Sequence, residues 1–465
     1  MGRRCHGWAA ITTILFIRYL TVRQGPLITL KLKLSMKRIL KYVLISICLL
    51  TFWIVLVFSG TRKGWWHDSI TKGQNDDDFI EAVHKKFDEQ FVGNFSMALV
   101  NKGVITDEIF YSAGKPVDRN TVFQVASLSK WVSAFGIMKL VEEGKLDLDV
   151  PVSKYLTRWE LPEGDFSNNG VTVRRLLSHT AGLTDGLGYS GFAPGEPVQS
   201  IEASLTKALD ADEGVEGAVR VGKEPGEAFA YSGGGYTLLQ LLVEEVSGQP
   251  FPSFMKEVIF GPLGMDHSTY VWEDASGSGL AEFYNSDGTE AAHYRYTSLA
   301  ATSLYTSLSD MEIFFRVFLE GSKNEPVGRS VLQPETIQLM RKAHAKTMGM
   351  DIWGLGTILY APTENGDFII GHDGRSTPAI NTAIRLDPQS GNGIIVLETG
   401  HPLLATELAG EWVFWRTGKV DITLFARLKD QMLDTIVKGG LVLVLLTFGT
   451  GFFRSSFVIR RFRSR

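Results

Sequence analysis

Ser127 and Lys130 are the residues whose types and spacing first suggest chemistry. They stand three positions apart near the start of residues 123–144, where apolar residues recur at helical spacing up to Gly144. Positions i and i+3 share one face of a helix, so the lysine amine would lie within reach of the serine hydroxyl. A serine needs a neighbouring base to become a nucleophile, and free N–H groups at a helix start stabilise negative charge on an attacked carbonyl. The pair is a candidate activated nucleophile.

The same spacing of serine and lysine occurs elsewhere in the chain, so the pattern alone is not specific. The other copies are Ser69 with Lys72, Ser112 with Lys115, Ser204 with Lys207 and Ser253 with Lys256. The Ser127 copy differs from these because a strand-like segment, residues 121–125, precedes it and a long amphipathic helix is predicted to follow it. Its assignment as a nucleophile depends on distant segments.

Two such segments carry polar residues next to glycines. Tyr231 lies in a glycine-rich loop just before a predicted helix, and a tyrosine near a lysine can relay a proton. His372 and Gly374 end a predicted strand, where a polar side chain and close backbone approach suit the wall of a substrate cleft. The alternatives are a tyrosine that packs at a loop edge and a structural histidine.

Together these residues resemble the penicillin-recognising serine hydrolases, which include class C β-lactamases, D-alanyl-D-alanine carboxypeptidases and related esterases and D-aminopeptidases. Ser127-Leu-Ser-Lys130 is similar to the family's S-x-x-K. Tyr231-Ser-Gly233 stands at its Y-x-N, and His372-Asp-Gly374 stands at its K-T-G, which is often H-x-G in esterase-like branches. Residues 146–156, 176–183 and 260–265 also look like the family, in order, and the resemblance covers about residues 78–418.

This resemblance implies an α+β fold, in which an antiparallel sheet is covered by helices and a mostly helical subdomain completes the active site, as in β-lactamases and transpeptidases. It implies that Ser127 attacks a carbonyl to form an acyl-enzyme, while Lys130 and Tyr231 share the proton transfer. The backbone N–H groups of Ser127 and Arg375 would form the oxyanion hole. The implied substrate-binding residues are His372, Gly374, Arg375 and Gly233. No cofactor and no metal are implied.

Two departures from the family pattern bear on the substrate. Gly233 stands where the family has an asparagine, so a side-chain amide that contacts substrate is missing. His372 replaces a lysine that helps to hold a substrate carboxylate, and a neutral imidazole holds an anion less well. Asp373 is expected to add a negative charge that disfavours anionic substrates further. His179 is a tempting triad base, but the resemblance implies a structural role for its segment.

The sequence therefore predicts a serine hydrolase that cleaves an ester or amide, such as a D-amino-acid peptide or a small ester, through an acyl-serine. A true β-lactamase is one alternative. The other alternative is a catalytically decayed binding protein on the same fold, for which the missing asparagine at Gly233 would be the sign.

The charges divide the sequence into an acidic middle and two basic ends. No Asp or Glu precedes Asp68 or follows Asp434, and 17 of the 47 Lys and Arg residues lie in these ends. The other 30 share the middle with all 51 acidic residues, which argues against nucleic acid as a partner. Cys5 and Cys48 both precede the acidic middle, so no disulfide is expected within it.

Two stretches are long and apolar enough to cross a bilayer. Residues 42–60 carry no charge, follow several lysines and precede Trp65 and Trp66, which predicts a span with a cytoplasmic N-terminus. Residues 436–453 are apolar except for Lys438 and precede several arginines, which predicts a second span running back inward. The alternatives are a cleaved signal peptide and an amphipathic or buried terminal helix.

We therefore expect a protein of the inner cell membrane with an extracytoplasmic or periplasmic catalytic domain. Its expected partners are the membrane, through one or two spans, and a small-molecule or peptide substrate, whereas the oligomeric state stays open. Met36 is an alternative start. The predicted segments are a basic cytoplasmic leader (1–41), an anchor (42–60), a linker (61–77), the hydrolase domain (78–418), a connector (419–435), a second span (436–453) and a basic cytoplasmic tail (454–465).

Periodicity and turn residues predict one sheet assembled from both ends of the domain, with a helical region inserted. Predicted helices cover residues 76–91, 173–178, 200–209, 236–246, 252–260 and 403–415, besides the helix near Ser127. Predicted strands cover residues 95–100, 105–112, 353–360, 367–372, 380–386 and 393–397.

Overall fold

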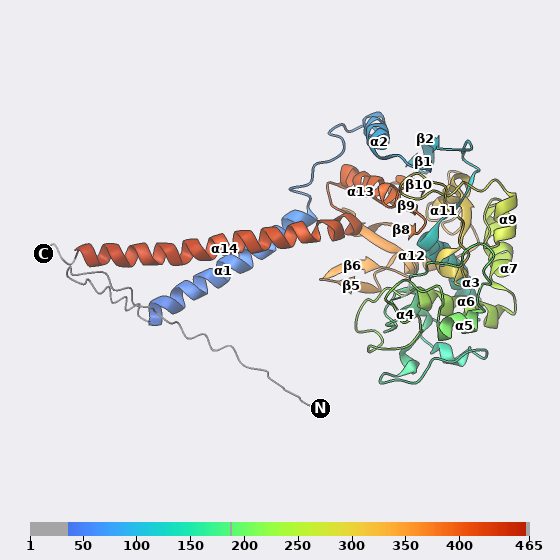
Figure 1. Ribbon diagram of the computed structural model, residues 1–465, viewed down its shortest axis with the longest axis horizontal. Helices are drawn as coiled ribbons and strands as arrows, with labels where there is room; N and C mark the ends of the chain where they lie inside the picture. The colour runs from blue at the N-terminus through green and yellow to red at the C-terminus, as the bar shows by residue number, and fades with distance from the viewer. Residues whose placement is uncertain (1–35, 187, 462–465) are drawn as a thin grey trace, which may run out of the picture. The chain divides into compact units, whose positions relative to one another are not determined.

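Two compact units make up the computed structural model, which describes residues 36–186 and 188–461. The larger unit is Ile54–Val437, and the smaller one is formed by the described residues up to Trp53 and from Lys438 onward. All the predicted site residues belong to the larger unit, and Figure 1 labels many of its strands and helices. The expected leader and Cys5 lie outside the described residues.

One eight-stranded antiparallel sheet is assembled from both ends of the larger unit, as the sequence predicts. Its strand order is β2-β1-β10-β9-β8-β7-β6-β5, so the first hairpin pairs with the last strand. The strands are β1 (Asn94–Asn101), β2 (Val104–Ser112), β5 (Ala345–Thr347), β6 (Met350–Trp353), β7 (Ile358–Pro362), β8 (Phe368–Ser376), β9 (Ile380–Leu386) and β10 (Gly393–Thr399). Two short strands, β3 (Val122–Gln124) and β4 (Tyr305–Ser307), form a separate pair.

The helices lie before, between and after these strands. The long ones are α1 (Met36–Arg62), α2 (Asp76–Gln90), α3 (Ser129–Glu142), α6 (Gly233–Ser247), α13 (Leu404–Thr417) and α14 (Ile422–Arg461). The shorter ones are α4 (Val173–Leu177), α5 (Ile201–Thr206), α7 (Phe251–Met255), α8 (Gly261–Leu263), α9 (Trp272–Gly277), α10 (Leu299–Thr302), α11 (Leu308–Arg316) and α12 (Pro334–Arg341). A 3₁₀ turn, η1 (Ala126–Leu128), joins β3 to α3, and a π turn, η4 (Lys256–Phe260), follows α7.

The central strands of the sheet are buried on both faces, and successive side chains of a strand reach opposite faces. On β1, Phe95, Met97 and Leu99 pack in the cluster that includes α2 and α13. Ala98 and Val100 point the other way, into the cluster that includes α3, α6 and α11. Figure 1 shows these two groups of helices on opposite sides of the strands. The sheet is therefore the middle layer of a three-layer unit.

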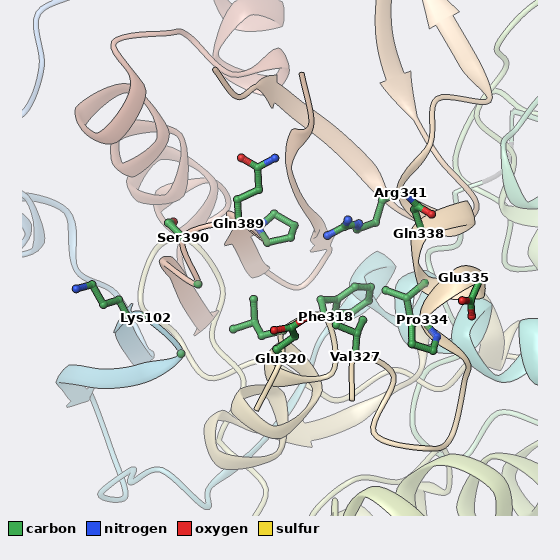
Figure 2. Close-up of a pocket in the computed structure, with 15 residues that line it drawn as sticks. Lys102, Phe318, Glu320, Val327, Pro334, Glu335, Gln338, Arg341, Gln389 and Ser390 are labelled. Atoms are coloured by element: carbon green, nitrogen blue, oxygen red, sulfur yellow. The ribbon is translucent and has the colours of Figure 1, made fainter. Parts of the chain in front are cut away.

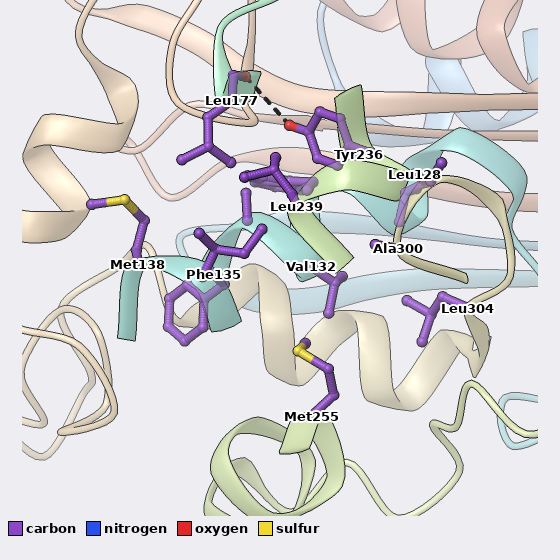
Figure 3. Close-up of a cluster of buried hydrophobic side chains, with 14 of the residues drawn as sticks. Leu128, Val132, Phe135, Met138, Leu177, Tyr236, Leu239, Met255, Ala300 and Leu304 are labelled. Carbon is purple, nitrogen blue, oxygen red and sulfur yellow. Dashed lines mark hydrogen bonds between the residues drawn. The ribbon is translucent and has the colours of Figure 1, made fainter. Parts of the chain in front are cut away.

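Helix α3 is buried on nearly every side, so the prediction of an amphipathic helix is wrong in this respect. From Ser129 to Leu140 every residue except Lys139 is buried. Figure 3 shows Val132, Phe135 and Met138 of α3 among apolar side chains from several other elements. A helix that is apolar all round belongs in a core, and this burial fixes the position of the turn that leads into it.

Other differences from the predicted elements come from turns. Residues 353–360 are two strands, β6 and β7, rather than the predicted single strand, because Gly356 with its positive φ of 73° lies in a turn between them. Strand β8 continues beyond the predicted end at His372 through Ser376. The predicted strands at 380–386 and 393–397 and the predicted helix at 76–91 match β9, β10 and α2 closely.

The buried Arg385 connects β8, the strand that carries His372, Asp373 and Gly374, to the start of α14. Arg385 on β9 is 0% exposed and donates to both carboxylate oxygens of Asp373 on β8, at 2.6 and 3.3 Å. Its Nε donates to Asp421 Oδ2 at 3.0 Å, and Asp421 Oδ1 accepts from the Leu424 N–H of the first turn of α14. Buried ion pairs need such complete partnering, so these three side chains hold β8, β9 and α14 together.

Two helices are long and apolar enough to cross a membrane. They run over Ile39–Arg62 and Ile422–Thr450, and both have large exposed apolar side chains. Helix α14 begins at Ile422, so it takes in residues that the sequence suggests as a connector. The free cysteine Cys48 lies in α1.

Strand β8 approaches the η1 turn so closely that Gly374 has no room for a side chain. A Cβ atom at Gly374 would lie 2.0 Å from the Val125 carbonyl oxygen and 2.3 Å from Thr382 Oγ1. The Thr382 hydroxyl donates to the same Val125 oxygen at 3.0 Å. Glycine at this position is therefore required by backbone contact between the first and third motifs.

We predict that Gly374→Ala lowers the free energy of unfolding by about 2 kcal/mol, since the new methyl group must push two backbone segments apart. Chemical denaturation measures this change. Gly277→Ala is the matched control, because its Cβ would meet nothing within 4 Å and it should unfold like the wild type. Equal stability of Gly374→Ala and Gly277→Ala would contradict the close approach.

Candidate active site

Ser127 lies in the η1 turn, between β3 and α3, with its side chain half-buried. The preceding residue, Ala126, has a positive φ of 46°, which is rare for a residue other than glycine. Such backbone strain persists only where the surrounding structure enforces it, and it is common at active sites. Here the buried β3 and α3 hold the turn from both ends, and the hydroxyl of Ser127 stands at its exposed side.

Two side chains from distant segments meet at the Ser127 hydroxyl. Lys130 Nζ donates to Ser127 Oγ at 3.1 Å, and the Tyr231 hydroxyl donates to the same oxygen at 3.0 Å. Lys130 reaches the serine from the first turn of α3, whereas Tyr231 comes from the loop before α6. The structure therefore brings together the three residues that the sequence predicts as catalytic.

Lys130 is almost completely buried, since 1% of the residue is exposed, and no carboxylate lies beside its amine. Among the described residues no Asp or Glu oxygen lies within 4.0 Å of Nζ. Its second hydrogen bond goes to the Ala301 carbonyl oxygen at 2.9 Å. The rings of Tyr231 and Tyr236 lie 5.0 and 5.6 Å away, within the range of cation–π attraction. The groups that surround the amine are thus a hydroxyl, a backbone carbonyl and two tyrosine rings.

The loop that carries Tyr231 is held by hydrogen bonds at the start of α6. Ser232 caps this helix, since its hydroxyl accepts from the Gly235 N–H at 2.7 Å and donates to Asp185 Oδ2 at 2.8 Å. Gly233 is the first residue of α6 and is buried. Tyr231 itself is 37% exposed, so this side chain lies at the solvent-accessible side of Ser127.

Strand β8 forms the opposite wall. His372 and Gly374 lie on the face toward α3, and Arg375 lies next to Gly374 with an exposed side chain. Strand β7 pairs with β8 only as far as Gly371, so one edge of residues 372–376 is free of strand pairing. The backbone of Arg375 belongs to this open-edged part of the strand, beside the η1 turn.

The His372 imidazole is neutral. Its Nδ1–H donates to the Asp373 carbonyl oxygen at 2.6 Å, so Nε2 carries the lone pair and has no partner among the described residues. Burial, with a smaller contribution from the nearby Lys130 charge, lowers the pKa of His372 to about 3. The third motif therefore supplies no fixed positive charge near neutral pH.

The expected influence of Asp373 on the substrate is wrong. The Asp373 carboxylate points to the other face of the sheet, where it forms the ion pair with Arg385. Side chains alternate along a strand, so the neighbours of a residue that faces the cleft face away from it. Its negative charge is neutralised by the guanidinium and does not face the serine.

Some contacts of the site have no signal in the sequence. The acceptor for Lys130 is a backbone carbonyl of Ala301, which any residue type offers. Trp353 packs edge-on against both His179 and His372, at centroid distances of 4.7 and 5.5 Å. For His179 the sequence does give a signal, since it lies in residues 176–183, which resemble the family. Its ring lies 4.4 Å from the Tyr231 ring, measured between centroids.

One cavity of the larger unit lies away from the three motifs. A cavity of about 490 Å³ lies between the β1–β2 turn, the end of α11, α12 and the β9–β10 turn. Figure 2 shows Lys102, Phe318, Arg341 and Gln389 around it, and none of its lining residues belongs to the three motifs. Within residues 36–186 and 188–461, no group of three His, Cys, Asp or Glu side chains is arranged to hold a metal ion.

Comparisons with known proteins find relatives among the penicillin-binding proteins. The chain is 36% identical to penicillin-binding protein 4* of Bacillus subtilis over 155 residues, which are 33% of this chain and 32% of that protein. It is 29% identical to the putative penicillin-binding protein PbpX of the same organism over 229 residues, 48% of this chain and 52% of PbpX. The chain spans less than two thirds of the length of these relatives.

Solved structures show the same fold. The octameric penicillin-binding protein homologue from Pyrococcus abyssi aligns with a TM-score of 0.60 and 27% identity over 74% of this chain and 78% of its own. The penicillin-binding protein from Bacillus halodurans, at 22% identity and a TM-score of 0.54, supports the fold alone. The sequence profile named Beta-lactamase matches residues 82–411. With this match over most of its length, the chain belongs to the Beta-lactamase family of penicillin-binding and β-lactamase-like serine hydrolases.

Proposed function

We propose that the protein is a serine hydrolase that cleaves an ester or amide through an acyl intermediate on Ser127. The observation that carries this proposal is the convergence of Lys130 Nζ and the Tyr231 hydroxyl on Ser127 Oγ, at 3.1 and 3.0 Å. Both distances are within the range needed for proton transfer. A decayed site would not need to keep two proton-transfer groups in contact with a serine on a strained turn.

In the first step Ser127 Oγ forms a bond to the substrate carbonyl carbon and gives up its proton to Lys130 or Tyr231. The group that takes this proton must act as a neutral amine or as a phenolate, so that it accepts from Ser127 instead of donating to it. The carbonyl π electrons move to the oxygen. The backbone N–H groups of Ser127 and Arg375 are the proposed donors to this oxyanion. Their support is the contact between the β8 strand and the η1 turn at Gly374 and Val125.

In the second step the oxyanion collapses and the bond to the leaving alcohol or amine breaks. Tyr231 is the better placed donor to the leaving group, because its hydroxyl is partly exposed whereas Lys130 is buried. Water then adds to the acyl-serine and gives up a proton to the same pair, which releases the acid and restores the Ser127 hydroxyl.

The proposed substrate class rests on the absence of a cation at His372 and of a side-chain amide at Gly233. Neutral His372 offers no ammonium to a substrate carboxylate, and Gly233 offers no side-chain amide. We therefore propose small esters, or D-amino-acid peptides without a free carboxylate beside the scissile bond, as substrates rather than β-lactams such as penicillins, which carry a carboxylate there. The relatives from Bacillus subtilis carry the name penicillin-binding protein.

We predict that a fluorophosphonate probe labels the wild-type protein at Ser127, and that Ser127→Ala abolishes the labelling. Lys130→Ala and Tyr231→Phe should each slow it by about 100-fold or more, since each removes one proton-transfer partner. Gel fluorescence over time measures the rates. Ser276→Ala is the control, because Ser276 is exposed on α9 and its loss should leave labelling unchanged. Ser129 is nearer to the site, but its hydroxyl is hydrogen-bonded inside the core. A wild-type protein that is not labelled and hydrolyses no activated ester contradicts the proposal and favours a binding protein.

A second prediction concerns the carboxylate. The double variant Gly233→Asn with His372→Lys should raise the rate of acylation by a fluorescent penicillin at least about tenfold relative to a neutral ester, because it adds an amide and a cation. Stopped-flow measurement of both rates gives the ratio, and Gly233→Asn alone is the control. No change in the ratio for a folded double variant would show that carboxylate recognition does not depend on these positions.

We further propose that the two apolar helices anchor the protein in a cell membrane, with the larger unit on the extracytoplasmic side. The support is their length and composition, together with the basic residues in both ends of the sequence. Trp65 and Trp66, both about half exposed, lie within four residues of the end of α1, at a position typical of a membrane interface.

The full-length protein should remain in the membrane fraction after an alkaline carbonate wash and enter solution only with detergent. Immunoblotting of the fractions checks this. Recovery of the protein in the soluble fraction with an N-terminus located after α1 would instead identify that helix as a cleaved signal peptide.

A further inference from the structure

We infer that His179 is a positioning residue that holds Tyr231 against Ser127, and this inference rests on the proposed function. His179 lies in the segment after α4 and is 2% exposed. Its backbone φ is positive, at 55°, which is unusual for a histidine. This conformation turns both its carbonyl oxygen and its ring toward the loop that carries Tyr231.

His179 accepts a hydrogen bond from each residue that flanks Tyr231. The Ala230 N–H donates to the His179 carbonyl oxygen at 2.8 Å, and the Ser232 N–H donates to His179 Nδ1 at 3.1 Å. Between these two bonds the Tyr231 ring lies over the imidazole, with a centroid distance of 4.4 Å and a tilt of 33°. One residue thus fixes the backbone on both sides of the tyrosine and the plane of its ring.

The hydrogen bonds also determine the protonation of His179. Because Nδ1 accepts, the neutral ring carries its proton on Nε2. Burial lowers the pKa of His179 well below its usual value, and the nearby positive charge of Lys130 lowers it further. A neutral imidazole can accept at Nδ1, whereas an imidazolium cannot. The ring does not contact Ser127, so it acts through Tyr231 rather than on the reacting atoms.

The segment that carries His179 is itself fixed. The Leu177 carbonyl oxygen accepts from the Trp353 indole N–H at 3.2 Å and from the Tyr236 hydroxyl at 3.3 Å. Trp353 also packs edge-on against the imidazole, and Figure 3 shows the bond between Tyr236 and Leu177. Contacts with α6 and β6 therefore fix the position of His179, and His179 in turn fixes the position of Tyr231.

Two substitutions separate the ring from the acceptor. His179→Phe keeps a flat ring but removes the acceptor, and His179→Asn keeps an acceptor near the position of Nδ1. We expect His179→Phe to lower kcat for an ester by about 100-fold with a much smaller change in KM, because displacement of a proton-transfer group by about 1 Å has an effect of this size. His179→Asn should recover part of the loss. His344→Asn, a partly buried histidine without contact to Tyr231, should keep wild-type kcat.

The decisive comparison uses the Tyr231→Phe background. If His179 acts through the Tyr231 hydroxyl, His179→Phe causes no further loss of kcat there. Crystal structures supply a readout that does not need activity: the Tyr231 hydroxyl should lie beyond hydrogen-bond distance of Ser127 Oγ in folded His179→Phe. An unchanged position of Tyr231, or an equal loss of kcat in the Tyr231→Phe background, overturns the inference. If the wild type is not labelled at Ser127, the proposed function fails while the crystal structures still decide the role of His179.

Discussion

The buried amine of Lys130 is the constraint on which the site depends. An amine in an apolar interior is costly unless its hydrogens find acceptors, and here the acceptors are the Ser127 hydroxyl and the Ala301 carbonyl. No carboxylate pairs with it in the described part of the chain, and such a pair would hold the amine away from the serine. These two hydrogen bonds, together with the surrounding aromatic rings and the packed α3, hold the amine beside the Ser127 hydroxyl, the proposed nucleophile.

Three separate elements must be held around that amine, and a different contact holds each one. The η1 turn touches β8 at Gly374, where no side chain fits. The Tyr231 loop is tied to the cap of α6 through Ser232. Strand β8 is secured from its far face by Arg385, whose second carboxylate, Asp421, begins α14. The first turn of α14 is thus part of the same hydrogen-bonded framework as strand β8, one wall of the candidate site.

The sequence predicts the antiparallel sheet and its order of assembly well, because alternating strands and glycine-rich turns are local signals. It also predicts the meeting of Ser127, Lys130 and Tyr231, through the resemblance rather than through any one pattern. It does not predict that α3 is buried all round, since periodicity does not report how many neighbours surround a helix. The Ala301 carbonyl and the direction of Asp373 depend on tertiary contacts and on strand register, which are not local properties.

The most direct test of the central claim is mass spectrometry of the intact protein during turnover of a slowly deacylated ester. An acyl-enzyme mechanism predicts a covalent adduct with the mass of the acyl group, at one per chain, located on Ser127 by peptide mapping and absent in Ser127→Ala. Hydrolysis without any adduct, or an adduct on another residue, would contradict the account of Ser127 as the nucleophile.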